Sequence, residues 1–338
     1  MNRIRFVICG FGHIGSRHST IVKGYPETDV VAIIDPREEV QEHHLYPTGV
    51  PYFRNFEDFR KSEIEADVVT IASPNSLHVP LAVKALEYGS HVVIEKPMGT
   101  SKLNCESLLS KALESNKQIF VVKQNRYSPP SKWLKQIVEE EVIGDIYMVQ
   151  INCYWNRDNR YYKQGGWKGT KDLDGGVLFT QFSHFIDIMF WVFGDIRNIK
   201  TNLQNFNHAH NTEFPDSGSS MFEFVNGGIG CINFSTSVWD TNMESSITVI
   251  GSKGSLKIGG QYMNEIEYCH IDNYEQPELP PTNPPNDYGP FKGSAANHHY
   301  VIENVVNTLR GNDSITANAF EGLKVVDIIE RIYKAVDG

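Results

Sequence analysis

Short, continuous runs of apolar residues mark the first third of the chain, and stretches with apolar residues at helical spacing separate the later runs. Val- and Ile-rich runs without polar alternation are typical of parallel strands covered by helices on both faces. The pattern therefore predicts a doubly wound α/β domain with a parallel Rossmann sheet over residues 1–122. The five candidate strands are IRFVICG, DVVAIID, ADVVTIAS, HVVIEKP and QIFVVKQ.

The pattern changes after Pro129 and Pro130, where apolar and polar residues begin to alternate. The segments 145–155, 217–239 and 245–260 alternate in this way and are joined by Gly, Asn and Ser turns. Such alternation predicts a large, mostly antiparallel sheet with one open face. An open face usually packs against another copy, so a homodimer or homotetramer is expected.

The remainder of the chain completes a second, α+β domain over residues 123–338, expected to bind substrate and to oligomerise. Its Pro-rich segment EQPELPPTNPPNDYGP predicts a long loop. Two helical segments, 297–311 and 318–336, close the chain, and the last helix is long enough to pack back on the first domain.

The composition limits the partners of the chain. With 338 residues and a formal net charge of -10, it lacks the basic surface that nucleic acids and anionic membranes require. No apolar run is long enough to span a bilayer, and the amino terminus enters a strand without a signal-peptide pattern. Five scattered cysteines with no CxxC pair predict reduced thiols in a cytoplasmic protein.

A glycine-rich hexapeptide follows the first predicted strand and precedes a helix. It consists of Gly10, Phe11, Gly12, His13, Ile14 and Gly15. Asp35 ends the next strand 20 residues after Gly15, the spacing of a carboxylate that bonds an adenosine ribose. A tight turn without a ligand is the alternative, but the strand–turn–helix context favours a dinucleotide. Asp35 should repel a 2′-phosphate, so NAD is expected rather than NADP, a preference that Arg37 weakens.

Two further segments place polar residues next to apolar ones. Lys96 follows the strand HVVI, where either a surface ion pair with Glu95 or a ligand at the carboxyl end of a parallel strand would explain it. On a predicted helix, Thr180, His184 and Asp187 are spaced i, i+4 and i+7 and so share one face among apolar neighbours. A core histidine bonded to Asp187 and a catalytic histidine are both compatible with this row.

Taken together, the glycine loop, SPNSLH at 73–78 and EKP at 95–97 resemble the glucose–fructose oxidoreductase/inositol dehydrogenase/MocA family. The stretch DGGVLFTQFSHFIDIMFWVFG is similar to that family's histidine helix, so the resemblance covers essentially the whole chain. It implies that Lys96 and His184 are catalytic and face each other across the substrate, and that the peptide before Pro97 is cis. The cofactor contacts that it implies beyond the glycine loop are Ser73, Pro74, Asn75, His78, Glu95, Lys96 and Gln124.

The chain departs from the family pattern at one position. Thr180, followed by Gln181, stands where the family has an aspartate four residues before the histidine. A hydroxyl cannot act as a carboxylate base or as a charged partner for Lys96. The departure argues against a three-residue Lys/Asp/His mechanism and against inositol- or glucose-type specificity.

The segment NRDNRYYKQGGWKGTKDLDGG resembles the nucleotide-sugar branch of the family, the 3-dehydrogenases of UDP-N-acetylglucosamine and its uronate. The resemblance assigns Arg157 and Tyr161 to the substrate, and Trp167 and Lys168 to NAD, substrate or both. Basic residues (Arg157, Arg160, Lys163, Lys168, Lys171) interleave here with aromatic ones (Tyr154, Trp155, Tyr161, Tyr162, Trp167). That mixture suits a pyrophosphate or carboxylate with a ring to stack on. A solvated connecting loop is the alternative.

The sequence thus predicts an NAD-dependent dehydrogenase that oxidises the C3 hydroxyl of a UDP-N-acetyl-hexosamine. His184 is expected to act as base and Lys96 to orient the substrate oxygen, because a lysine acts as base only where its pKa is lowered. Thr180 and Gln181 are expected to contact the substrate. The alternatives are a dehydrogenase of a free sugar, inositol, trans-dihydrodiol or other polyol, and a dinucleotide-binding sensor or assembly subunit without turnover.

No metal site is expected. The histidine pairs at 43/44, 208/210 and 298/299 lack a third ligand at metal spacing and are expected at the surface or in loops.

Overall fold

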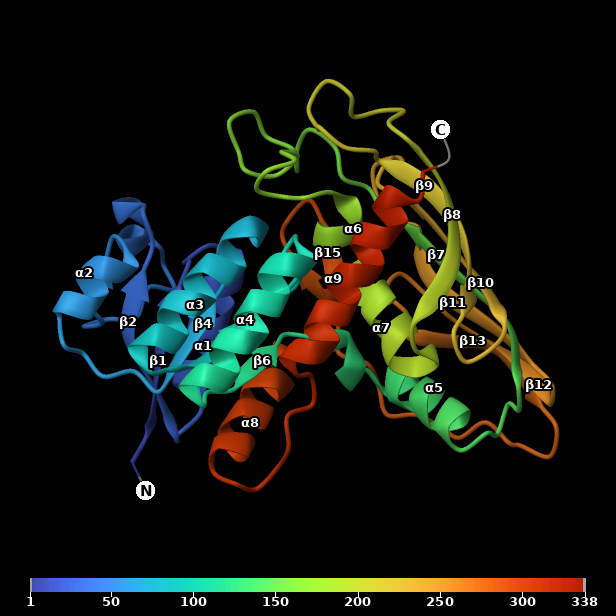
Figure 1. Ribbon diagram of the computed structural model, residues 1–338, viewed down its shortest axis with the longest axis horizontal. Coiled ribbons are helices and arrows are strands. Elements are labelled where there is room, and N and C mark those ends of the chain that lie inside the picture. The colour runs from blue at the N-terminus through green and yellow to red at the C-terminus, as the bar shows by residue number, and fades with distance from the viewer. Residues whose placement is uncertain (1, 337–338) are drawn as a thin grey trace. The chain divides into compact units, whose positions relative to one another are not determined.

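The computed structural model describes residues 2–336, which form two compact units (Figure 1). The first unit consists of the chain up to Val122 together with His298–Leu323, and the second of Lys123–Asn297 together with the chain from Lys324 onward. The sequence placed 298–323 in the second domain, whereas this segment belongs to the first unit. Backbone pairing accounts for the difference, since the N–H of Val121 donates to the carbonyl of Ala317 at 3.0 Å.

The first unit is built on a six-stranded parallel sheet, which confirms the predicted Rossmann architecture. The strand order is β3-β2-β1-β4-β5-β6. All five predicted strands are present, and the pattern missed only β3, which has two residues. The strands are β1 Ile4–Cys9, β2 Thr28–Ile34, β3 Tyr52–Phe53, β4 Val68–Ile71, β5 His91–Ile94 and β6 Ile119–Val121.

Helices cover both faces of this sheet because the chain reverses direction after β3 (Figure 1). Right-handed crossovers that progress in opposite directions from β1 place their helices on opposite faces. The point of reversal lies between β1 and β4, and α/β folds bind ligands outside the carboxyl ends of strands at such a point. The helices are α1 His13–Gly24, α2 Phe56–Lys61, α3 His78–Tyr88, α4 Lys102–Ser115 and α8 His298–Leu309.

The second unit is built on a seven-stranded sheet of order β13-β12-β11-β7-β10-β9-β8. All neighbours are antiparallel except β7 and β10, so the sheet is mostly antiparallel, as predicted. The sequence pattern missed β8 and β13, the two edge strands, whose charged and exposed residues obscure the alternation. The strands are β7 Ile146–Tyr154, β8 Ile196–Gln204, β9 Ser217–Phe224, β10 Ile229–Ser235, β11 Glu244–Gly251, β12 Gly254–Gly259 and β13 Glu265–Ile271.

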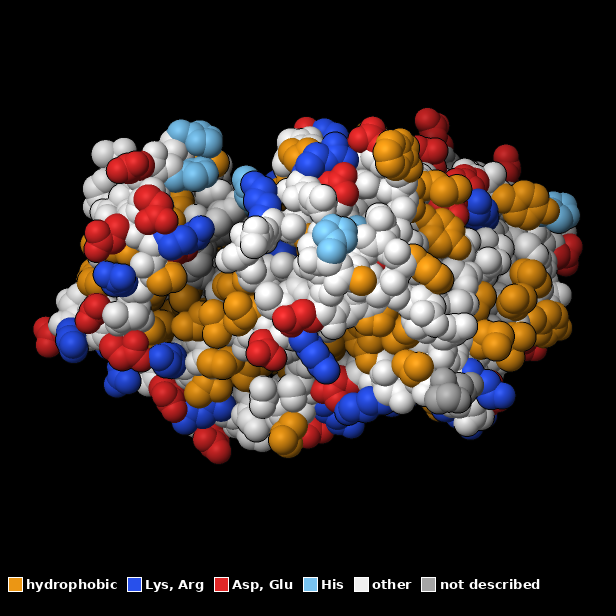
Figure 2. Space-filling view, turned by 90° about the horizontal axis from the view of Figure 1, so that it is seen from above, with side chains coloured by type: hydrophobic (Ala, Val, Ile, Leu, Met, Phe, Trp, Pro, Cys, Tyr) orange, Lys and Arg blue, Asp and Glu red, His pale blue; other side chains and the backbone are white. Residues whose placement is uncertain are grey.

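One face of this sheet is covered and the other is open. Helices α5 (Pro129–Glu139) and α7 (Ser183–Phe193) lie on the covered side (Figure 1). Apolar side chains on the open side are exposed, and Figure 2 shows hydrophobic surface gathered at this end of the molecule. The remaining elements are α6 Val177–Thr180, β14 Pro285–Asp287, β15 Lys292–Ala295 and α9 Ala319–Lys334. Within residues 2–336, no helix combines the length and the apolar character needed to cross a bilayer.

The prediction that Thr180, His184 and Asp187 lie on one continuous helix is wrong. Helix α6 ends at Thr180 and α7 begins at Ser183. The amide of Phe182 donates to the carbonyl of Val177, five residues back, at 3.1 Å. Such a widened turn inserts an extra residue into the helical spiral and rotates the residues before it relative to those after it. A break in the helix therefore separates Thr180 from the other two residues.

Asp187, on α7, anchors that helix through a buried group of charges. Its carboxylate accepts from Arg126 Nε and Nη2, both at 2.8 Å, and lies 3.2 Å from Lys123 Nζ. All three side chains are at most 2 % exposed. Burial alone would raise the pKa of Asp187, but the charges of Arg126 and Lys123 hold the pKa below its ordinary value. The carboxylate is therefore ionised and offsets part of the charge of two buried basic side chains.

We expect Asp187→Asn to destabilise the fold strongly, because it leaves two cations buried without their counter-charge. Breaking a buried ion pair on one side costs roughly 3–5 kcal/mol. The free energy of unfolding, measured in urea, should fall by about that amount. Glu114→Gln is the matched control, since Glu114 forms only an exposed pair with Lys111, and it should change stability by less than about 1 kcal/mol. Equal midpoints for Asp187→Asn and wild type would contradict this role.

Candidate active site

Two of the three glycines in the loop after β1 are packed closely against backbone atoms. Gly10 has a φ of +92°, and a Cβ there would lie 2.5 Å from the carbonyl oxygen of Ala72. A Cβ on Gly15 would lie 1.8 Å from the carbonyl oxygen of Gly10. At Gly12, by contrast, a Cβ would meet no protein atom within 4 Å. Two glycines are thus required by the fold, and the third leaves the backbone facing open space, as a bound pyrophosphate needs.

The amino terminus of α1 is directed at this loop without a side-chain cap. Gly12 is the capping residue and has no side chain that could accept a hydrogen bond from the first turn. The first turn also holds no acidic residue. The N–H groups and the positive end of the helix dipole are therefore suited to an anion. Of the other loop residues, Phe11 is buried, Ile14 is half-buried and His13 is exposed.

Asp35, just beyond the carboxyl end of β2, is held by the same loop. Its carboxylate accepts from the amide of Phe11 at 2.7 Å and from Arg37 Nε and Nη2 at 2.8 and 2.9 Å. Burial opposes ionisation of Asp35, but the hydrogen bonds from Arg37 and Phe11 keep its pKa below the ordinary value. An ionised carboxylate at this position accepts hydrogen bonds from a ribose and repels a 2′-phosphate. These residues therefore fit NAD, whose adenosine ribose is unphosphorylated.

The turns that follow β4 and β5 are tied together by His78. Its Nδ1 lies 2.7 Å from the carbonyl oxygen of Pro97, and its Nε2 lies 2.9 Å from that of Ser73. His78 thus joins the predicted cofactor segment Ser73, Pro74 and Asn75 to the turn that carries Lys96. The Lys96–Pro97 peptide bond is cis.

Glu95 is not a surface partner of Lys96, since its side chain enters the core of the first unit. Its Oε1 lies 2.8 Å from His18 Nε2 and 3.6 Å from His298 Nε2, and its Oε2 accepts from the backbone amide of Lys96 at 3.2 Å. Burial opposes its ionisation, yet the hydrogen bond with His18 and the neighbouring charges lower the pKa of Glu95 to about 2. A buried carboxylate therefore fixes the strand end from which Lys96 projects.

The expectation that the histidine pairs lie at the surface or in loops is wrong for one residue, His298. His298 begins α8 and is buried beside His18, and burial lowers its pKa to about 3. His208 is also buried, with its Nδ1 3.1 Å from Asp216. Sequence spacing missed the burial of His298 because its partner, Glu95, is distant along the chain.

His18, Glu95 and His298 place three possible metal-ligand atoms within 4.8 Å of one another. The 2.8 Å separation of the first two, however, is that of a hydrogen bond. Neither Nδ1 has a hydrogen-bond partner, whereas metal-bound histidines normally donate their other ring N–H to an acceptor. The arrangement therefore fits an anchored carboxylate better than a metal centre.

The second unit contains the predicted substrate residues as a connected group. Arg157 Nε donates to Gln181 Oε1 at 3.0 Å, and Gln181 Nε2 donates to the Tyr161 hydroxyl at 2.6 Å. Lys168 Nζ lies 3.8 Å from the centre of the Tyr161 ring. The structure thus brings four of the predicted residues to one place, around the phenol of Tyr161.

Two cations of this group have no carboxylate partner. Among residues 2–336, no carboxylate lies within ion-pair distance, 4.0 Å, of Arg157 or Lys168. Burial, followed by the charge of Arg157, lowers the pKa of Lys168 to about 8. Arg160 differs, because it pairs with Asp158 and Asp240. Of the predicted basic cluster, Arg157 and Lys168 are thus the two cations that lie beside Tyr161 without a carboxylate of residues 2–336 at ion-pair distance.

Asp174 is a residue of this region that the sequence analysis missed. Its carboxylate accepts from the amide of Gly169 at 2.9 Å and from the Thr180 hydroxyl. The signal was an acidic residue directly before Gly175 and Gly176 at a helix start, a common capping pattern.

His184, the second residue of α7, is 6 % exposed. Gln124 is buried, and its amide donates to Ser294 at 3.2 Å, while Trp167 is half-buried.

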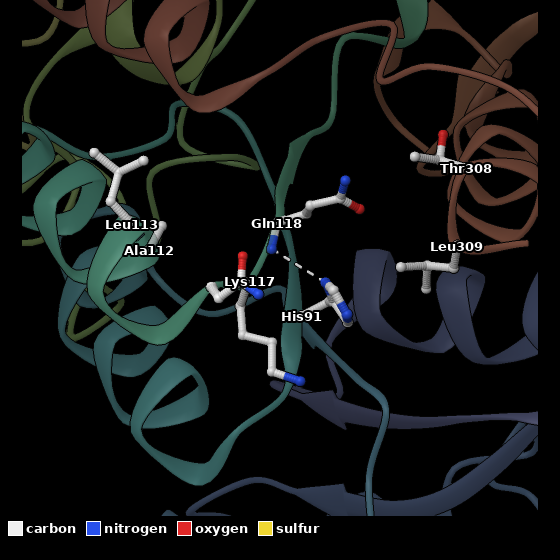
Figure 3. Close-up of a pocket in the computed structure, with 8 residues that line it drawn as sticks. His91, Ala112, Leu113, Lys117, Gln118, Thr308 and Leu309 are labelled. Carbon is white, nitrogen blue, oxygen red and sulfur yellow. Dashed lines mark hydrogen bonds between the residues drawn. The ribbon is translucent and has the colours of Figure 1, made fainter. Parts of the chain in front are cut away.

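A separate pocket of about 360 Å³ lies elsewhere on the first unit. Figure 3 shows His91, Lys117 and Gln118 beside the end of α4, with Thr308 and Leu309 of α8 opposite. His91, Lys117 and Gln118 lie at the amino ends of β5 and β6. The glycine loop and Lys96 lie at the carboxyl ends of the strands, so this pocket is not part of the candidate site.

Comparison with known proteins agrees with this geometry. Residues 4–123 match the family described as "Oxidoreductase family, NAD-binding Rossmann fold", and residues 132–257 match "GFO/IDH/MocA C-terminal domain". The WlbA dehydrogenase from Bordetella pertussis, solved in complex with NADH and UDP-GlcNAcA, is 28% identical with a TM-score of 0.87, over 99% of this chain and 96% of that one.

Two curated relatives are more distant. Oxidoreductase P35 from Formosa agariphila is 26% identical over 63% of this chain and 68% of its own length. The 2,7-anhydro-N-acetylneuraminate hydratase from Escherichia coli is 24% identical over 76% of this chain and 68% of its own. The two matched domains, the glycine loop with its carboxylate and the Glu95-Lys96-Pro97 turn together show that this chain belongs to the GFO/IDH/MocA family and is an NAD-dependent oxidoreductase of the CH–OH dehydrogenase type.

Proposed function

We propose that this enzyme oxidises the C3 hydroxyl of a UDP-N-acetyl-hexosamine or its uronate, as a step in making a nucleotide sugar for surface polysaccharide. The observation that carries the proposal is the pair of cations, Arg157 and Lys168, that lack carboxylate partners around Tyr161. An anionic pyrophosphate or carboxylate supplies the missing charge, and the aromatic ring supports a base or sugar. The likeness to a dehydrogenase solved with UDP-GlcNAcA supports the same substrate class.

The two cations differ in their access to a ligand. Arg157 is 2 % exposed and donates to Gln181, to Asn242 and to two backbone carbonyls. It therefore positions Gln181 and contributes its positive charge from below the surface, without reaching the ligand itself. Lys168 is only half-buried, and its ammonium is the group that would contact the anion. Trp167, beside it, would contact the cofactor or the substrate.

Lys96 and His184 divide the chemistry in this proposal. His184 takes the proton of the C3 hydroxyl, while Lys96 donates a hydrogen bond to the same oxygen and orients it. When bound, NAD supplies the acceptor for the hydride that leaves C3. The C–H and O–H bonds of the alcohol break, and a ketone forms at C3. Glu95 keeps the backbone of Lys96 in place through its buried hydrogen bonds.

A free sugar, an inositol or another polyol is the second candidate substrate class. The spread of activities among relatives favours keeping it, since one of them is a 2,7-anhydro-N-acetylneuraminate hydratase. A neutral polyol would leave the charge of Arg157 and Lys168 without a counterpart, which is why it ranks second. A sensor that binds its dinucleotide without turnover ranks third, because the chain belongs to a family of oxidoreductases.

The direct test is NADH absorbance with purified protein, NAD and four compounds: UDP-N-acetylglucosamine, its uronate, N-acetylglucosamine and myo-inositol. We expect NADH with the UDP sugars alone, because only they carry the anionic group that Lys168 and Arg157 require. A preference for the uronate would assign the cations to its C6 carboxylate. NADH with a free sugar or inositol alone would overturn the proposal, and silence with all four would favour the sensor.

We expect Lys96→Met to lower kcat by at least about 100-fold, the scale of a lost group that acts on the reacting oxygen. Its affinity for NAD, followed by fluorescence titration, should stay within about threefold, because the glycine loop and Asp35 hold the cofactor. Lys61→Met is the control, since the Lys61 side chain is 79% exposed on α2. Turnover above about a tenth of wild type in Lys96→Met would show that Lys96 is not catalytic.

We also propose that the protein is a homodimer or homotetramer joined through the open face of the seven-stranded sheet. Met148, Ile229 and Ile250 lie next to one another across β10, β7 and β11 and are 37%, 55% and 41% exposed. Contiguous apolar residues on a sheet face favour burial against another copy.

The five cysteines are all free thiols, which supports a cytoplasmic setting that cell fractionation would test.

Light scattering should therefore give a mass of two or four chains for the wild type and a smaller mass for Ile229→Glu, which places a charge in this row. Leu113→Glu is the matched control, because Leu113 is 83% exposed on α4 of the first unit and its variant should keep the wild-type mass. A monomeric wild type, or an unchanged mass for Ile229→Glu, would contradict the proposed interface.

A further inference from the structure

A buried carboxylate closes the loop that carries Lys168. Asp174 is 1% exposed, and its Oδ2 accepts from the amide of Gly169 at 2.9 Å. Its Oδ1 accepts from the hydroxyl of Thr180, the last residue of α6. One side chain therefore connects the residue after Lys168 to the residue before Gln181. Both of those neighbours, Lys168 and Gln181, belong to the group around Tyr161.

The contact with Asp174 determines how Thr180 can bond to anything else. A hydroxyl has one hydrogen to donate and two lone pairs that accept. An ionised carboxylate has no hydrogen of its own, so the hydrogen of Thr180 must point to Asp174. The Thr180 oxygen is then restricted to accepting, and a group that bonds to it must be a donor such as a sugar hydroxyl.

We propose that Asp174 is a positioning residue that fixes the hydrogen of Thr180, so that Thr180 selects a substrate hydroxyl presented as a hydrogen-bond donor. The proposal rests on the proposed function, since it takes Thr180 and Gln181 to face the substrate. It gives Thr180 a role of its own, which a carboxylate at that position would not share. A substrate group that can only accept, such as a methyl ether or carbonyl oxygen, is rejected.

The proposal carries a pH dependence. Burial raises the pKa of Asp174 to about 6, and the hydrogen bonds from Thr180 and Gly169 limit the rise. Above that pH the carboxylate is ionised and Thr180 accepts. Below it the protonated carboxyl can donate to Thr180, so the hydrogen of Thr180 is no longer held at Asp174 and the site loses its fixed acceptor for the sugar hydroxyl. Affinity is therefore expected to fall as the pH drops through about 6.

Four titratable groups that interact electrostatically with Asp174 do not change charge in this range. Tyr161, Tyr162 and Tyr333 interact electrostatically with Asp174, and burial raises the pKa of each phenol. Lys168, whose pKa is lowered to about 8 by burial, stays cationic through pH 6. A transition near pH 6 that depends on the Thr180 hydroxyl is thus specific to the Asp174–Thr180 pair.

The test is the Kd of UDP-N-acetylglucosamine uronate for the NADH-loaded protein, measured by calorimetry between pH 5 and 8. This complex does not turn over, so binding is measured apart from catalysis. At pH 7, where Asp174 is mostly ionised and Lys168 mostly cationic, we expect Thr180→Val and Asp174→Asn to weaken binding roughly 3–10-fold, the scale of one hydrogen bond. Thr180→Ser, which keeps the hydroxyl, should bind like wild type.

Two further comparisons identify the mechanism. The double variant Asp174→Asn/Thr180→Val should bind no more weakly than Thr180→Val alone, because Asp174 acts through Thr180. The loss of affinity below about pH 6 should appear in wild type and in Thr180→Ser and be absent from Thr180→Val. If Asp174→Asn fails to fold, the pH profiles of the two Thr180 variants decide alone.

The outcomes separate this inference from the proposed function. Independent losses that multiply in the double variant, or a pH profile that Thr180→Val leaves unchanged, would overturn the role of Asp174. Tight binding by wild type without NADH formation from the same compound would contradict the proposed function and leave the inference standing. No measurable binding by wild type would overturn both.

Discussion

A buried carboxylate needs hydrogen-bond donors in place of water, and this requirement determines the structure around key residues in both units of the protein. Asp35 receives the amide of the glycine loop and Arg37, and Glu95 receives His18 and the amide of Lys96. Asp187 receives Arg126 and Lys123. Each carboxylate lies next to a segment with a proposed function, so the hydrogen bonds that make burial tolerable also hold that segment still.

The two units offer different kinds of groups to the charged parts of a ligand. In the first, backbone N–H groups and an uncapped helix terminus are offered to a phosphate, and a carboxylate nearby is ready for neutral hydroxyls. In the second, two side-chain cations lie beside an aromatic ring with no carboxylate of the described residues at ion-pair distance. A ligand with an anionic portion and a ring suits the second arrangement, and NAD suits the first. Fold alone would not separate these roles, since the family's architecture carries several substrates.

Local patterns were enough to predict the Rossmann strands, the glycine loop, Asp35 and the turn after β5, because each depends on residues close together in the chain. What the sequence missed has more than one cause. His298 has its partner Glu95 in another part of the first unit, and the break before Ser183 follows from a single five-residue hydrogen bond at Val177. Asp174 was passed over because an acidic residue before two glycines is common at helix starts.

The central claim is that C3 of a UDP-N-acetyl-hexosamine or its uronate is the carbon that loses hydride. The most direct measurement uses UDP-N-acetylglucosamine and its uronate carrying deuterium at C3, with mass spectrometry of the NADH formed. The account predicts deuterated NADH and a slower reaction than with unlabelled substrate. NADH without deuterium would contradict it, because the hydride would then come from another carbon.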